Sequence, residues 1–75
     1  MADEDSVRVE IAFDGGQIMS AFVTSQGADE LERALGAGGE GTHGLDATDG
    51  RYTVVLRRVV YVKRFARESR VGFGI

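Results

Sequence analysis

The feature that most constrains the fold is a strict two-residue alternation near the start of the chain. Between residues 7 and 13, the odd positions are all apolar and the even positions are mostly polar. A period of two is typical of a β-strand with one buried and one wet face. Asp14-Gly15-Gly16 follows, and these residue types tolerate the positive φ angles of a tight hairpin turn. The pattern predicts a hairpin whose second strand covers residues 17–24.

That second strand carries apolar residues on both faces. One face holds three of them: Met19, Ala21 and Val23. The other face mixes Ser20 with Ile18 and Phe22. We expect burial mainly through the uniformly apolar face, although Phe22 favours the opposite one.

After residue 24 the period of the apolar residues becomes helical. Thr24 or Ser25 can act as the N-cap. Acidic residues follow near the predicted N-terminus, where the helix dipole favours negative charge: Asp29, Glu30 and Glu32. The apolar stripe consists of Ala28, Leu31, Ala34 and Leu35. We predict a helix of about ten residues that packs against a sheet and has Gly36 as its C′ residue.

The glycine-rich stretch from 36 to 44 holds five glycines in nine residues and predicts a mobile loop. A short strand is expected over 45–48, and Asp49-Gly50 is a second hairpin signal. A loop followed by a hairpin therefore connects the helix to the last third of the chain.

The last third is the most β-prone part of the sequence. Strands are predicted over 51–56 and 59–65, which are rich in Val, Tyr and Thr. Arg57-Arg58 between them is either a turn or an interruption within a strand. Residues 71–75, apolar with alternating glycines, are expected to pack as an edge strand or onto a neighbour.

The element order predicts an α+β domain with a mostly antiparallel sheet and one covering helix, ββαββ(β). A β-grasp-like arrangement fits best, and a small half-open β-barrel with one helix is the alternative. Residues 1–6 are expected to form a disordered acidic lead-in, and 7–75 a single small domain. The predicted core consists of Val9, Ile11, Phe13, Leu31, Leu35, Val54, Leu56, Val60 and Val62.

Size and composition limit the class of protein. A chain of 75 residues has room for one domain with a small core, which self-association often stabilises. It has no cysteine, hence no disulfide or thiolate site. An acidic start and no apolar run of about 20 residues argue against a signal peptide and a membrane span. We expect a soluble cytoplasmic protein with no membrane partner.

Charge is sorted along the sequence. Residues 1–50 hold eleven acidic and two basic residues, a net of −9, whereas residues 51–75 hold seven basic and one acidic, a net of +6. Such asymmetry concerns partners rather than fold. Opposed charges and exposed strand edges favour a homo-oligomer or binding to another protein.

The predicted interaction surface consists of the late cations and the aromatic residues among them: Arg57, Arg58, Tyr61, Lys63, Arg64, Phe65, Arg67, Arg70 and Phe73. Nucleic-acid binding through the same basic strands is the alternative, since cations can hold phosphates while aromatic rings stack on bases. The overall charge of −3 argues against it.

No residue pattern points to catalysis, a cofactor or a metal. His43 is the only histidine, whereas zinc sites need about three or four protein ligands. Ser25 and Ser69 have no base nearby in the sequence. The glycine-rich loop follows a helix instead of preceding one, and its charged residue, Glu40, repels phosphate. Nucleotide or anion binding is therefore a minor alternative, and we do not expect an enzyme.

The last third also resembles a known family. The segments 45–51, 58–62 and 70–74 (LDATDGR, RVVYV and RVGFG) are similar to those of short uncharacterised actinobacterial proteins that end in Arg-Val-Gly-Phe-Gly. The resemblance covers most of residues 7–74 and includes the helical segment 28–35. It implies a compact bacterial domain of unknown function. Some members are labelled ATP-binding, which no pattern here supports. The glycine-rich insertion and Lys63-Arg64 depart from the family.

Overall fold

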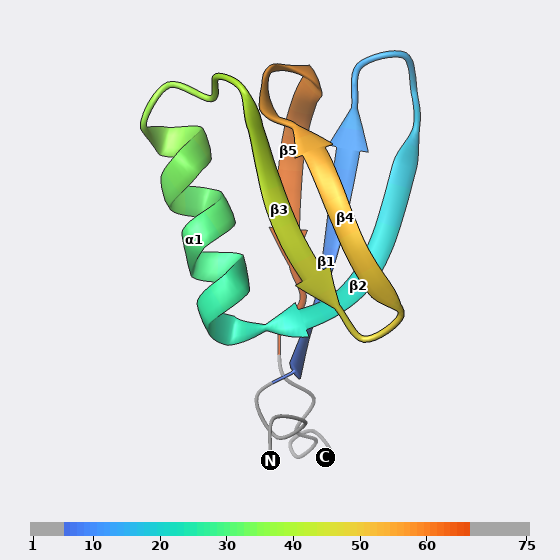
Figure 1. Cartoon of the computed structure of the whole chain (residues 1–75). Helices are drawn as coiled ribbons and strands as arrows, with labels where there is room; N and C mark the ends of the chain where they lie inside the picture. The colour runs from blue at the N-terminus through green and yellow to red at the C-terminus, as the bar shows by residue number, and fades with distance from the viewer. Residues whose placement is uncertain (1–5, 67–75) are drawn as a thin grey trace.

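The computed structural model describes residues 6–66 (Figure 1). Its elements follow one another along the chain as β1 (Ser6–Phe13), β2 (Ile18–Thr24), α1 (Ser25–Gly36), β3 (Thr42–Ala47), β4 (Gly50–Val55), the 3-10 turn η2 (Leu56–Arg58) and β5 (Val59–Arg64). Most of the predicted lead-in lies outside the described residues, but Ser6 already belongs to β1. No helix within residues 6–66 is long and apolar enough to cross a membrane.

The first hairpin forms as predicted. Its turn is closed by the Phe13 N–H, which donates to the Gln17 carbonyl at 2.8 Å, and Gly15 and Gly16 both have φ near +90° (92° and 91°). Pairing places Val9 opposite Ala21, so the alternating apolar residues of both strands share one face. Met19, Ala21 and Val23 thus lie on the core side, as expected, and Phe22 lies on the other side.

Helix α1 begins at the expected cap and ends later than expected. The Thr24 hydroxyl accepts a hydrogen bond from the Gly27 N–H at 2.9 Å. Gly36 is the last helical residue, not C′, because the chain turns only at Gly38 and Gly39, which have φ of +129° and +64°. The Gly39 N–H donates to the Ala34 carbonyl at 3.2 Å and closes the helix end.

All neighbouring strands are antiparallel, in the order β4-β3-β2-β1-β5. The β2–β3 ladder is limited to the pair Val23–Ala47, whereas β1 and β2 pair along their whole length. The sheet bends at this weak joint, and the β3–β4 hairpin crosses over β1 and β2 (Figure 1). Val54 and Leu56 therefore join Val9, Ile11 and Leu31 in one core cluster.

Residues 6–66 form a small α+β domain with one helix and a five-stranded antiparallel sheet, which confirms the predicted class. The β-grasp-like arrangement is not confirmed by this strand order. The half-open barrel stays a prediction. The bend brings the β3–β4 hairpin over β1 and β2, as a partly closed barrel would require.

Strand β5 differs most from its prediction. Arg57 and Arg58 form a 3-10 turn, which resolves the two interpretations of that pair. Ala12 pairs with Tyr61 and Phe13 with Val59, so Val60 is an extra residue in a β-bulge. Val60 is 64% exposed, and its predicted place in the core is wrong. Among the other predicted core residues, Phe13, Leu35 and Val62 are only partly buried against the core.

Strand β3 begins inside the glycine-rich stretch, three residues before the predicted start at 45. The Leu56 N–H donates to the Gly41 carbonyl at 3.0 Å, and Thr42 pairs with Val55, so the stretch is held against η2 at residue 41 and against β4 from residue 42. At Gly44 the absence of a side chain leaves room for the Arg51 guanidinium, which an added Cβ would meet. Only the part of the glycine-rich stretch between α1 and Thr42 is therefore a loop, and the part from Thr42 belongs to β3.

Candidate interaction surface

The structure distributes the predicted cations over several surfaces. Arg58 pairs with Asp14 (nitrogen to oxygen 3.1 Å). Arg64 reaches α1, where it lies 2.7 Å from an Asp29 oxygen and 3.9 Å from a Glu32 oxygen. The hydrogen bond to Asp29 raises the pKa of Arg64 above its already high ordinary value. Three predicted site residues lie outside the described residues: Arg67, Arg70 and Phe73.

Another group of predicted residues gathers on the side of β2, β1 and β5 away from the core. The register gives this surface, here called the outer face, the residues Arg8, Glu10, Ala12, Ile18, Ser20, Phe22, Tyr61, Lys63 and Phe65. Helix α1 packs on the opposite side, because its buried residues belong to the core cluster. The outer face is thus a surface of three paired strands.

Large apolar side chains are exposed on this face. Ile18 is 60% exposed, Phe22 50% and Tyr61 44%. Ala12 stands between Ile18 and Tyr61 in the register and is only 6% exposed, because those neighbours cover it. Exposed apolar groups gathered on one surface, with polar groups around them, are typical of interaction sites.

One end of the outer face carries cations around an aromatic ring. The Arg8 guanidinium carbon lies 4.4 Å from the centre of the Phe65 ring, and the Lys63 ammonium nitrogen lies 4.5 Å from it. Such contacts are attractive because the ring face is negative. The Phe65 N–H also donates to the Arg8 carbonyl at 2.9 Å, which holds the ring beside β1.

Tyr61 is oriented by a carboxylate on the same face. Its hydroxyl donates to Glu10 at 2.6 Å. This hydrogen bond, helped by partial desolvation and by the negative charge of Glu10, raises the pKa of Tyr61 above its ordinary value of 10.0. One carboxylate oxygen of Glu10 is therefore engaged in a hydrogen bond with Tyr61.

A groove of about 240 Å³ lies beside Phe22, where β2 and β3 diverge. Its lining comes from β1, β2 and β3 and consists of Ser6, Phe22, Val23, Thr24, Asp46, Ala47 and Thr48. The Thr48 N–H donates to the Phe22 carbonyl at 3.0 Å and closes one end of the diverging strands. The short β2–β3 ladder thus leaves a recess next to the most exposed aromatic ring of the outer face.

Sequence reasoning did not select Arg8, Ile18 or Phe22. The signal was present, because residues 17–24 carry large apolar groups on both faces although only one face packs on the core. The grouping itself depends on the antiparallel register, which places Arg8 opposite Phe22. Reading the cations of the last third in isolation could not find it.

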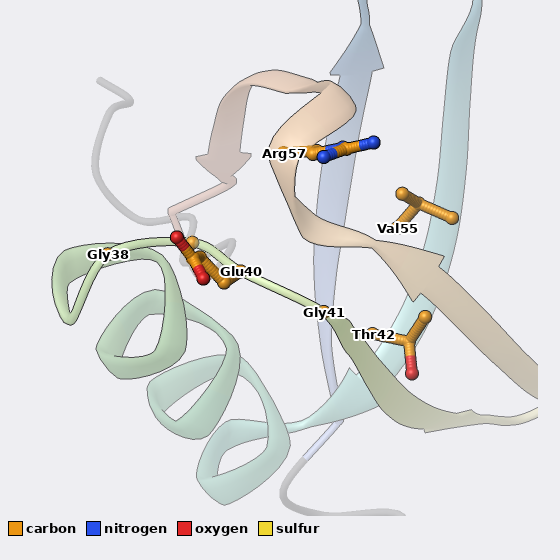
Figure 2. Close-up of a pocket in the computed structure, with 7 residues that line it drawn as sticks. Gly38, Glu40, Gly41, Thr42, Val55 and Arg57 are labelled. Atoms are coloured by element: carbon orange, nitrogen blue, oxygen red, sulfur yellow. The ribbon is translucent and has the colours of Figure 1, made fainter.

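The glycine-rich stretch borders a second cavity, of about 390 Å³, between the helix end and η2. Arg57, Glu40 and Val55 are among its lining residues, and Figure 2 shows the Arg57 and Glu40 side chains extending in different directions. No carboxylate within residues 6–66 lies within 4.0 Å of the Arg57 guanidinium. The cavity thus has one cation, Arg57, and one anion, Glu40, whose side chains do not point to a common place.

The remaining polar candidates serve local structure. Asp46 accepts a hydrogen bond from Arg51 at 2.9 Å, and Asp49 accepts one from the Tyr52 hydroxyl at 2.7 Å, which raises the pKa of Tyr52. His43 pairs with Val54 across the β3–β4 ladder. Within the described part of the chain, no three His, Cys, Asp or Glu residues are placed to hold a metal ion.

Comparison of the chain with protein-family models, with curated proteins and with solved structures gave no match. The outer face therefore has to be interpreted from its own residues.

Proposed function

We propose that this protein is a non-enzymatic interaction module of the bacterial cytoplasm that self-associates through its outer face. The observation that carries the proposal is the exposure of Ile18, Phe22 and Tyr61 on the sheet surface opposite the helix. Burying such side chains against a second copy removes apolar area from water, at about 25 cal/mol per Å². The resemblance of residues 7–74 to short actinobacterial proteins stays part of this proposal.

Small size supports self-association. The core is built from five strands and a single helix, and small domains often gain stability from a partner. Aromatic side chains such as Phe22 and Tyr61 are enriched at protein interfaces, and Tyr is among the residue types that anchor them. The cations Arg8 and Lys63 lie at one end of the face and can form a polar rim.

Single-stranded nucleic acid is the second candidate for the outer face. The observation that favours it is the closeness of Arg8 and Lys63 to the Phe65 ring, because aromatic rings beside cations suit bases and phosphates. Against it, the same face carries Glu10, and the chain has a net charge of −3. Nucleotide binding at the Arg57 cavity is weaker still, because Glu40 lines that cavity too.

The test is the molar mass in solution over a concentration series, by light scattering and sedimentation. We expect a dimer or larger species that Phe22→Ser dissociates. Val55→Ser is the matched control, because Val55 is also exposed (42%) but lies on β4, the far edge strand. A wild-type chain that stays monomeric at every concentration, or binds an oligonucleotide with steep salt dependence, would overturn the proposal.

A further inference from the structure

The two edge strands of the sheet differ in how they are protected. Strand β5 has a bulge at Val60 and carries Lys63 and Arg64. Bulges and charged side chains, above all Lys, are common means of blocking an edge. Strand β4 instead pairs with β3 in a regular register over all six of its residues, and it contains neither Lys nor Pro (Figure 1). Its one cation, Arg51, pairs with Asp46 of its own hairpin.

The register shows which backbone groups of β4 lie at its free edge. The Leu56 N–H donates to the Gly41 carbonyl, and in an antiparallel ladder such bonded pairs alternate with unbonded ones. Every second residue of β4 therefore directs its N–H and C=O away from β3, among them Thr53 and Val55. Within residues 6–66 these groups make no hydrogen bond to another element. A row of this kind is a template for a further strand.

A groove of about 240 Å³ lies beside this edge. Its lining comes from residues 52–55 of β4, from Phe13, Gln17 and Met19 of the first hairpin, and from Arg58. None of the lining residues belongs to β3, so the groove lies on the free side of β4. Phe13 and Met19 are only partly buried against the core. The groove is smaller than the 300–1,000 Å³ or so that is typical of small-molecule sites, and it suits the side chains of one strand.

We propose that the free edge of β4 binds an extended peptide segment of another protein, which adds a strand to the sheet and places apolar side chains in this groove. In strand addition, main-chain hydrogen bonds give affinity and pockets for alternate side chains give specificity. A segment of alternating apolar and polar residues fits, because its apolar row enters the groove while its polar row stays in water. This site is separate from the outer face, so the inference does not rest on self-association.

A second copy of this chain does not suit the groove. Within the described sheet only the edge strands β4 and β5 have a free side for pairing. The inner-face side chains of these strands are already packed in their own core: Val54 is 2% exposed, and Val59 and Val62 are partly buried against the same cluster. Such side chains cannot also fill a groove on another molecule. A peptide that is not yet part of a sheet has its apolar row free to do so.

The first measurement is amide hydrogen exchange by NMR, with the full-length chain and the probe peptide acetyl-Glu-Val-Thr-Val-Thr-Val-Glu-amide. In the free protein, the Thr53 and Val55 amides should exchange fast, and those of Tyr52 and Val54, which bond to β3, should exchange slowly. At about 1 mM peptide, exchange at Thr53 and Val55 should slow by about tenfold or more, with Tyr52 and Val54 as internal controls.

Two results of this measurement would overturn the inference. Slow exchange of Thr53 and Val55 in the free protein would mean that another part of the chain, or a second copy, already covers the edge. Unchanged exchange in the presence of the peptide would mean that no strand is added.

Variants separate backbone pairing from simple apolar contact. Thr53→Pro removes an N–H at the free edge and leaves the ladder to β3 intact, because Pro is tolerated on the open side of an edge strand. It should weaken peptide binding by about tenfold or more. Thr53→Ala is the matched control, because it keeps the N–H and should bind as the wild type does. Equal affinities of the two variants would contradict strand addition.

A second peptide, with Ser in place of each Val, tests the groove. Its row towards the groove is polar, so it should bind at least about tenfold more weakly than the first peptide. Equal binding of the two peptides would show that the groove receives no apolar side chain. Slow exchange at Tyr52 and Val54 shows that Thr53→Pro is folded, and if it is not, the exchange measurement on the wild type still decides.

Discussion

The two faces of the β1–β2 hairpin are made by the same strands but differ sharply in exposure. On the inner face, Val9 and Ile11 are fully buried. On the outer face of β2, Ile18 and Phe22 are 60% and 50% exposed, although they are as apolar as the residues behind them. A sheet packed on one side needs apolar residues on that side only. Packing on the helix side does not account for the apolar residues of the outer face, and we propose that they serve binding.

The largest expected effect is a difference in the free energy of unfolding between substitutions on the inner and on the outer face. Ile11→Ala should lower the free energy of unfolding by about 2–5 kcal/mol, because it leaves a cavity among fully buried neighbours. Ile18→Ala should change it by less than about 0.5 kcal/mol in the monomer. Urea unfolding at a concentration where the chain is monomeric measures both. Equal losses would mean that the outer face is part of the folding core, contrary to our interpretation.

Prediction from sequence succeeded where local pattern decides the structure. Alternation in residues 7–13, the Asp-Gly-Gly turn and the helical stripe around Leu31 all correspond to observed elements. In each case the determining residues are within a few positions of one another, so the period and the turn chemistry are sufficient.

The errors share a different cause, which is pairing between distant segments. Val60 is exposed because β5 takes up one extra residue against β1, far away in sequence. The glycines near residue 42 suggested a loop, and only the ladder to β4 makes that stretch a strand. The outer face likewise exists only once Arg8, Phe22 and Tyr61 are brought together by the register. Periodicity within one segment carries no information on such pairings.

The second prediction concerns the helix that covers the inner face. Thr24→Ala should destabilise the domain by about 1 kcal/mol, since the Gly27 N–H loses its acceptor. Ser25→Ala is the matched control: the sequence offered Ser25 as the alternative cap, yet Thr24 supplies the capping oxygen. Thermal or urea unfolding compares the two variants. A larger loss for Ser25→Ala would show that the helix begins one residue later than in the structure.

A smaller effect is expected from two ion pairs, one that contacts the helix on the inner side and one on the β3–β4 hairpin. Arg64 and Asp29 join β5 to α1, and the Arg64 side chain is 34% exposed, whereas the side chains of the pair Arg51–Asp46, which joins β4 to β3, are 65% and 79% exposed. Double-mutant cycles with Arg→Gln and Asp→Asn should give a coupling of about 0.5 kcal/mol for the first pair and close to zero for the second. Added salt should reduce the first value. Equal couplings would show that the smaller exposure of Arg64 does not strengthen its ion pair.

The smallest effect is a titration on the outer face. The Tyr61 pKa is raised mainly because its hydroxyl donates to Glu10, and the Tyr52 pKa mainly because of Asp49. Since the folded pKa lies above the unfolded one, this contribution to stability is complete below pH 10.0 and is lost as pH rises through the raised pKa of Tyr61. Glu10→Gln should return the Tyr61 pKa towards its ordinary value and leave Tyr52 unchanged, while Asp49→Asn should do the reverse. Tyrosinate absorbance during an alkaline titration follows both groups. If Glu10→Gln moved neither transition, the outer-face hydrogen bond would not persist in solution, and Glu10 would be available to a partner.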